Sequence, residues 1–251
     1  MSDEWLRTGI GHSDADSITL MGRDLASELM GNTTLTELAF LLVRRRPPTE
    51  HEARLLDAVL VSLADHGLTP IALSARLTYT GAPESLQGAI AAGLLGGGSV
   101  FLGVVEDTAA FLSGALERGE SAADAVRGCI EGGRRVPGLG HPVHKVQDPR
   151  TPRIYAIAEE TGQLGEHLRL LREVAAAHRS ITRRELPVNG AGVAGAALAD
   201  LGFPPALLRG FALLARTAGL LGHLAEEMER PIGMPLYREV DERAVYDPPT
   251  S

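Results

Sequence analysis

Histidine, arginine and glycine residues gather in one short segment, residues 138–150, which has the sequence GLGHPVHKVQDPR. Gly138 and Gly140 allow the backbone to approach a ligand closely, and the imidazole of His141 can donate or accept a proton near neutral pH. Residues 132–153 hold five basic side chains and one acidic one, a local charge of +4 in a chain whose net charge is −8. This concentration of positive charge predicts either an anion-binding pocket around His141 or a solvated basic loop.

Metal and nucleophile chemistry are disfavoured. His141 and His144 are spaced as two metal ligands on one helix would be, but Pro142 between them argues against such a helix. The chain has one cysteine, Cys129, which excludes a disulfide framework and any multi-cysteine metal site. Cys129 is expected within a helix and has no cluster of basic neighbours, so we predict neither a metal centre nor a cysteine nucleophile.

The run GAGVAG at residues 190–195 matches the G-x-G-x-x-G fingerprint of dinucleotide-binding proteins. The preceding segment, residues 186–189, is too short for a central strand and contains a proline. No acidic residue follows at the required distance of about 20 residues. We therefore predict that these glycines allow close backbone packing at the start of a helix.

Arg216 lies within the apolar stretch FALLARTAGLLGHLAEEM, which predicts burial of its guanidinium. A buried guanidinium requires a carboxylate or phosphate partner. That partner is either an acidic residue such as Asp65 or an anionic ligand. His223, on the same predicted helix, is expected to have a packing role.

Helical periodicity runs through almost the whole chain and predicts an all-α fold. Thr34 with Glu37, and Thr49 with Glu52, form two capping boxes; the first helix stops at Pro47 and the second by Gly67. Further helices are predicted over residues 70–79, 84–95, 108–118, 121–131, 151–161, 164–178, 192–199 and 205–230. The segments without plain helical character are residues 65–67, 134–150, 186–195 and 231–238, and the acidic tail from Asp241 is expected to be loose.

The composition points to a globular chain. It has 251 residues, 44% hydrophobic and 22% charged, values that exclude a disordered or fibrous protein. The acidic balance disfavours a nucleic-acid binder, and the longest apolar stretch, residues 90–105, is shorter than the about 20 residues of a membrane span. The polar start MSDEWLRTG does not look like a signal peptide, so we expect a soluble cytoplasmic protein.

Three stretches together resemble the citrate synthase superfamily. They are DHGLTP at residues 65–70 with Ala75-Arg76, the segment 138–150, and RTAG at 216–219 followed by His223 and GMPLYR at 233–238. Residues from about Trp5 to Arg238 follow the family's order. The chain lacks the N-terminal extension of a full-length citrate synthase, so the similarity is to the short form, citryl-CoA lyase and the C-terminal module of ATP-citrate lyase.

This resemblance implies an all-α homodimer made of a large helical domain and a smaller lid domain. The large domain would comprise residues 1–103 and 200–251, with the lid at 104–199. The resemblance also implies a small-molecule substrate, the thioester of coenzyme A, and no tightly bound cofactor. The residues that it assigns are His141 and His66 as catalytic, Arg150, Arg216, Arg238 and Asn189 as substrate-binding, and Lys145 and Arg76 as coenzyme A-binding. Arg238 would come from the neighbouring subunit.

The implied reaction is cleavage of citryl-CoA to acetyl-CoA and oxaloacetate, with His141 taking the proton of the tertiary hydroxyl. The sequence departs from the family at two positions, because Ala191 stands where the family has an aspartate and Leu102 where synthases have a histidine. The short lyase-type members also lack that histidine. Residues that could replace the aspartate are Asn189, Glu185, Glu106 and Asp107. Two other functions stay open: a catalytically silent binding protein for citrate or coenzyme A, and an enzyme for another 2-oxo acid and acyl-CoA.

Overall fold

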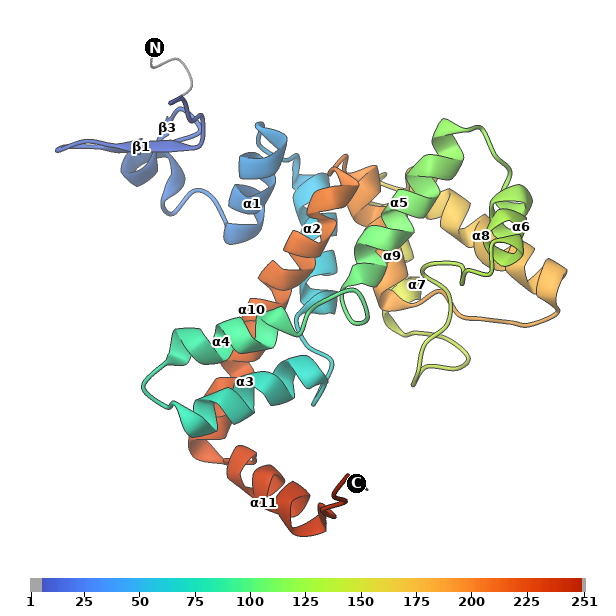
Figure 1. The fold of residues 1–251 in the computed structure, drawn as a ribbon. Helices are drawn as coiled ribbons and strands as arrows, with labels where there is room; N and C mark the ends of the chain where they lie inside the picture. Colours follow the sequence, from blue (N-terminus) through green and yellow to red (C-terminus); the bar gives the residue numbers. More distant parts are fainter. Residues whose placement is uncertain (1–5, 250–251) are drawn as a thin grey trace.

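The computed structural model describes residues 6–249, and helices make up most of this part of the chain (Figure 1). The all-α prediction is therefore confirmed. Trp5, where the resemblance begins, lies outside the described residues. The described α-helices are α1 (Leu35–Arg44), α2 (Glu50–Leu63), α3 (Pro70–Gly81), α4 (Leu86–Leu95), α5 (Gly103–Glu117), α6 (Ala122–Glu131), α7 (Arg150–Glu160), α8 (Glu166–Thr182), α9 (Gly190–Asp200), α10 (Leu208–Glu229) and α11 (Gly233–Arg243).

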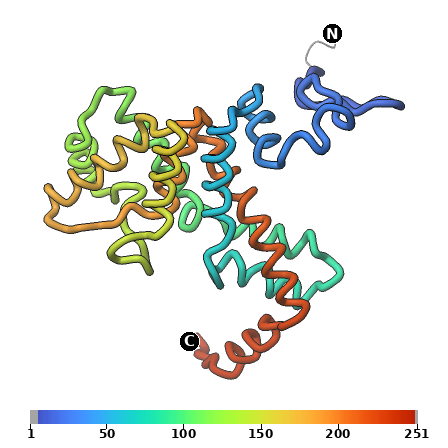
Figure 2. The backbone as a smooth tube through the Cα atoms, turned by 180° about the vertical axis from the view of Figure 1, so that it is seen from behind, coloured from blue at the N-terminus to red at the C-terminus, as the bar shows by residue number. Residues whose placement is uncertain are grey.

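A small antiparallel sheet precedes the helices and was not predicted. Strands β1 (Gly11–Ser13), β2 (Ile18–Leu20) and β3 (Arg23–Asp24) pair in chain order, and the π-helical turn η2 (Leu25–Leu29) follows. Met21 and Gly22, which join β2 to β3, both have positive φ, as a tight hairpin turn requires. Figures 1 and 2 show this sheet at the edge of the molecule, beyond α1.

Both predicted capping boxes are present. The Thr34 hydroxyl accepts the backbone N–H of Glu37 while the Glu37 carboxylate accepts that of Thr34, and Thr49 and Glu52 repeat the arrangement. Each box satisfies two backbone donors that helix geometry leaves unpaired. Helices α1 and α2 therefore begin where the sequence predicts.

The largest differences from the predicted helices are an earlier start of α5, a later end of α8, and a helix, α11, that was not predicted. Helix α5 begins at Gly103, and α8 continues to Thr182. Residues 231–238, predicted as irregular, belong largely to α11 because the Glu227 carboxylate at the end of α10 accepts the backbone N–H groups of Ile232 and Gly233. A cap supplied by the preceding helix leaves no local motif in the sequence.

Helix α9 is packed on several sides and explains the glycine run. It contacts α2, α5, α7 and α8, and its residues from Gly192 to Ala199 are buried. A Cβ on Gly195 would collide with the carbonyl oxygen of Val105 in α5, and one on Gly192 would lie 2.5 Å from the Cα of Gly138. The prediction of close backbone packing at a helix start is confirmed.

Helix α10 connects distant parts of the fold. It packs against α2, α3, α4 and α5, after the short 3-10 helix η3 (Pro205–Leu207), and at about 1.5 Å per residue its 22 residues span about 33 Å. In both views α11 lies at the end of α10, far from α6 and α8 (Figures 1 and 2). No helix within residues 6–249 is long and apolar enough to cross a membrane.

Candidate active site

A cavity of about 710 Å³ brings together most of the sequence-predicted site residues. Its walls come from the α2–α3 connection, the segment that enters α5, the loop 135–150, the start of α9 and the middle of α10. The predicted residues in its lining are His66, His141, Arg150, Asn189 and Arg216. The loop around His141 therefore borders a cavity, with Arg135 and Arg150 in the lining, while Arg134, Lys145 and Arg153 are exposed to solvent.

Backbone hydrogen bonds fix the loop that carries His141. Gly138 and Gly140 have φ of +80° and +81°, a region that favours glycine. The Asn189 N–H donates to the Gly138 carbonyl at 2.9 Å, and the Gly140 N–H donates to the Pro187 carbonyl at 2.7 Å. The Asn189 side chain donates to the Gly140 carbonyl and caps α9 by accepting the Gly192 N–H, both at 2.8 Å. Asn189 therefore holds the loop, and one of its amide N–H groups remains for a ligand.

The loop also determines how the His141 ring is protonated. Its Nδ1 accepts the backbone N–H groups of Val143 at 3.1 Å and His144 at 3.0 Å. Burial and the neighbouring His144 lower the pKa of His141, which favours a neutral ring. A neutral imidazole with Nδ1 as acceptor carries its proton on Nε2. In this arrangement the Nε2–H of His141 is available to donate a hydrogen bond to a ligand oxygen.

His66, His141 and His144 form a cluster in which one nitrogen of each ring lies within 4.8 Å of the others. The rings of His141 and His144 stack at 4.5 Å, and His66 lies 5.2 Å from His141. A metal-bound histidine normally donates its second N–H to an acceptor, whereas the Nδ1 of His141 faces two backbone donors. The cluster therefore suits hydrogen bonds to an anionic ligand better than metal coordination. The sequence singled out His144 only as a possible metal ligand; the structure places it in this cluster but not in the lining of the cavity.

Asp148 holds Arg150 at the edge of the cavity. Its fully buried carboxylate accepts the Nε–H of Arg150 at 2.9 Å, an Nη2–H at 2.7 Å and the Gly190 N–H at 2.8 Å. Burial alone would raise the pKa of Asp148, but these hydrogen bonds outweigh it and hold the pKa well below its usual value. The remaining nitrogen of the Arg150 guanidinium, Nη1, is left for the Ser62 carbonyl at 3.4 Å or for a ligand.

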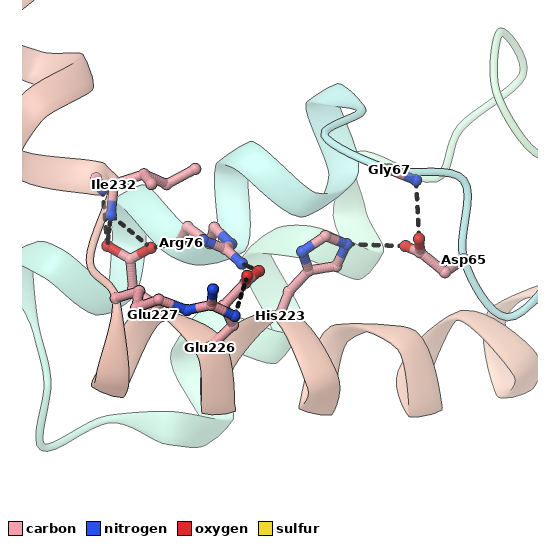
Figure 3. Close-up of polar contacts among 9 residues, drawn as sticks. Asp65, Gly67, Arg76, His223, Glu226, Glu227 and Ile232 are labelled. Carbon is pink, nitrogen blue, oxygen red and sulfur yellow. Dashed lines mark hydrogen bonds and ion pairs between the residues drawn. The ribbon is translucent and has the colours of Figure 1, made fainter.

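Arg216 is buried beside the cavity without sufficient partners. Its Nη1 lies 3.9 Å from the Asp65 carboxylate, too far for a hydrogen bond, and neither Nε nor Nη1 has a hydrogen-bond partner among the described residues. Asp65 is held instead by the His223 ring and the Gly67 N–H, both at 2.8 Å (Figure 3). His223, which was expected to have a packing role, thus forms a hydrogen bond with the Asp65 carboxylate. The predicted ion pair between Arg216 and Asp65 therefore leaves hydrogen-bond donors of the Arg216 guanidinium unpaired.

Arg76, which the resemblance assigns to coenzyme A binding, is paired with two carboxylates of α10. Its side chain is 2% exposed and bonds to the carboxylates of Glu226 and Glu227, the latter at 3.1 Å (Figure 3). Glu227 in turn caps α11 at Ile232 and Gly233. Arg76 therefore links α3 to α10 and to the start of α11, and it is absent from the lining of the cavity.

Lys145 and Arg238 lie outside the cavity. The Lys145 ammonium donates to the His141 carbonyl at 3.2 Å on the exposed side of the loop. Arg238 is exposed on α11 and is absent from the lining of the cavity in its own chain. Ala191 and Leu102, the two departures from the family pattern, both line the cavity.

Comparison with known proteins identifies the family of the chain. The family model described as citrate synthase, C-terminal domain, matches residues 8–238. Citryl-CoA lyase from Hydrogenobacter thermophilus is 32% identical, with a TM-score of 0.89 over 98% of this chain and 96% of that one. ATP citrate lyase from Methanothrix soehngenii, solved with citrate and coenzyme A, shares the fold at 24% identity and a TM-score of 0.84, over 98% of this chain and 42% of that one.

Among curated proteins, ATP-citrate synthase beta chain protein 1 of Oryza sativa subsp. japonica is 27% identical over 224 residues, which cover 82% of this chain. The match covers 36% of the rice protein, so the chain spans about a third of that relative's length.

Proposed function

Because this chain belongs to the citrate synthase family, we propose that it is a lyase that cleaves citryl-CoA to acetyl-CoA and oxaloacetate. The tertiary hydroxyl loses its proton and becomes the carbonyl of oxaloacetate. The adjacent C–C bond breaks, and its electron pair forms the enolate of acetyl-CoA, which then takes up one proton. The reaction is reversible in principle and needs no metal or redox cofactor; coenzyme A enters as part of the substrate.

The observation that carries the proposal is the unsatisfied guanidinium of Arg216. A buried cation with unpaired N–H groups is costly unless a ligand supplies acceptors. A carboxylate of citryl-CoA can accept from Arg216, and a second carboxylate can accept from the free edge of Arg150. Two arginines on one cavity therefore match a substrate with several carboxylates.

Two histidines act on the tertiary hydroxyl of the substrate, each in a different role. His141 donates its Nε2–H to the oxygen on which negative charge develops, since its Nδ1 is occupied by backbone donors. His66 lines the same cavity 5.2 Å from His141, ring to ring, and takes the hydroxyl proton. This assignment replaces the expectation that His141 is the base.

We further propose a cytoplasmic homodimer in which residues 104–199 form a lid. Exposed apolar residues on α11, such as Tyr237 and Val240, support burial against a second subunit. Arg238 on the same helix would then reach the partner's cavity.

Lys145, exposed on the loop, would meet the phosphates of coenzyme A. A buried, single cysteine suits a reducing compartment.

The direct test is turnover of citryl-CoA by the purified protein. The oxaloacetate that forms is measured by a coupled enzymatic reduction. We expect oxaloacetate and acetyl-CoA in equal amounts, and His141→Ala to lower the rate by about 10²- to 10⁴-fold. His12→Ala is the matched control, because His12 is exposed in β1 outside the cavity. A wild-type protein inactive in both the cleavage and the condensation direction would refute the proposal.

Subunit mixing tests the shared site. Arg238→Ala and His141→Ala proteins are each expected to be inactive alone. If Arg238 serves the partner's cavity, a re-equilibrated equal mixture regains about a quarter of the wild-type activity, since half of the dimers are mixed and each has one intact site. No recovery, with mixed dimers demonstrated by tagged chains, would contradict the shared site.

Ala191 in the cavity lining favours a second candidate, a binding protein that retains the anion pocket but does not turn over. Calorimetry distinguishes the two functions: this candidate binds citrate and coenzyme A without forming products. An enzyme for another 2-oxo acid would show turnover only within a panel of related substrates.

A further inference from the structure

The proposed cleavage requires a proton donor for the enolate of acetyl-CoA, and Ala191 cannot provide one. A methyl side chain carries no ionisable group, so the proton must come from another residue on the same cavity or from water. Asp107 in α5 is the one carboxylate in the lining of the cavity as far as residues 6–249 describe it. It is exposed, and it has no hydrogen bond or ion pair with another described residue.

The backbone places Asp107 near Ala191. A Cβ on Gly138 would lie 3.0 Å from the Thr108 side chain and 3.2 Å from the Cα of Gly192. Thr108 directly follows Asp107, and Gly192 directly follows Ala191. The two positions therefore flank the same glycine of the loop, with α5 and α9 packed against each other there.

The other residues that could replace the missing carboxylate are engaged elsewhere. Glu106 pairs with Arg209 at 3.0 Å. Glu185 is exposed and pairs with Arg179 at 3.3 Å. Neither glutamate lines the cavity, and the side-chain amide of Asn189, which does, is not an acid or base near neutral pH.

We propose that Asp107 is the catalytic acid–base for the acetyl group, an inference that rests on the proposed lyase function. In cleavage, the protonated carboxyl of Asp107 donates its proton to the enolate carbon, so that acetyl-CoA and the Asp107 carboxylate form. In condensation, the carboxylate removes a methyl proton and leaves the enolate. Because Asp107 is exposed, it exchanges the transferred proton with water after each turnover.

Hydrogen exchange isolates this step from C–C chemistry. The protein is incubated in D2O with acetyl-CoA and malate, a dicarboxylate that can fill the anion pocket but has no carbonyl to attack, and deuterium in the acetyl group is measured by mass spectrometry. We expect Asp107→Asn to lower both exchange and citryl-CoA cleavage by about 100-fold or more, with citrate affinity within about twofold of wild type. Glu117→Gln makes the same change on an exposed position of α5 outside the cavity and should leave both activities unchanged.

Each outcome is decisive. Exchange in Asp107→Asn at the wild-type rate would overturn the inference while leaving the lyase function intact. Loss of citrate binding together with exchange would also overturn it, because Asp107 would then be needed for binding. A wild-type protein that neither exchanges nor cleaves would instead refute the proposed function.

Discussion

Replacing Asp148 by asparagine tests how the site is built into the fold. The Asp148 carboxylate is fully buried and accepts hydrogen bonds from Arg150 and from the Gly190 N–H at the start of α9. An asparagine side chain has the shape of the aspartate side chain but no charge. Its NH2 group would face one of the N–H donors that the carboxylate now accepts. The Arg150 guanidinium, with 20% of its side chain exposed, would then lack its counter-ion beside Arg216.

The expected cost follows from this burial. Breaking a buried ion pair by removing one partner typically costs about 3–5 kcal/mol, because the remaining charge is uncompensated. The partial exposure of Arg150 places the expected loss near the lower end, about 3 kcal/mol of unfolding free energy at neutral pH. Citrate affinity should also fall, since Arg150 loses its fixed orientation.

The pH dependence has a definite sign. The pKa of Asp148 is lowered in the folded protein from a usual value of 3.8, so its contribution is complete above that pH and is lost as the pH falls toward the folded value. The difference in stability between wild type and Asp148→Asn should therefore be constant near neutral pH and shrink below about pH 4.

Urea denaturation at several pH values measures both effects, with Asp124→Asn on the exposed side of α6 as the matched control. A loss below about 1 kcal/mol at neutral pH with an unchanged m-value would show that the ion pair contributes little, and the reasoning from burial would be wrong.

Three further predictions concern other parts of the fold. The hydrogen bond from Arg46 lowers the pKa of Glu52 to about 2, so Glu52→Gln should cost about 1–2 kcal/mol of unfolding free energy near neutral pH, fading below pH 4.5, as measured by pH-dependent denaturation. Gly192→Ala places a Cβ 2.5 Å from the facing backbone and should lower stability by about 1–3 kcal/mol in thermal unfolding, whereas Gly222→Ala meets open space and should not. Burial raises the pKa of the Cys129 thiol, so it should react with a thiol reagent only on unfolding; rapid labelling of the native protein would contradict its burial.

The sequence predicted those features whose signals are local. The Thr34 and Thr49 capping boxes involve residues three positions apart, and both helices start as predicted. The segment around His141 was identified through its glycines, imidazoles and charge, and the structure places it at the cavity. Amphipathic periodicity likewise predicted most of the helices.

Features that depend on distant residues were not predictable in this way. Helix α11 begins at Gly233 because Glu227 caps it, and Arg76 is buried because the same glutamate pairs with it. The tautomer of His141 follows from the conformation of its own loop, which no pattern of residue types reveals. The strands β1–β3 have two or three residues each, too few for a period-two pattern to emerge.

The loop that presents His141 is held mainly through peptide groups. Its carbonyls at Gly138 and Gly140 bind Asn189, and the ring is oriented by the N–H groups of its own following residues. Side chains at exposed loop positions such as Val143 and Val146 take no part in this scaffold. Substitutions of these two side chains should therefore leave the orientation of the His141 ring unchanged, and Val143, which also lines the cavity, is the position of the two at which the shape of the cavity can be altered.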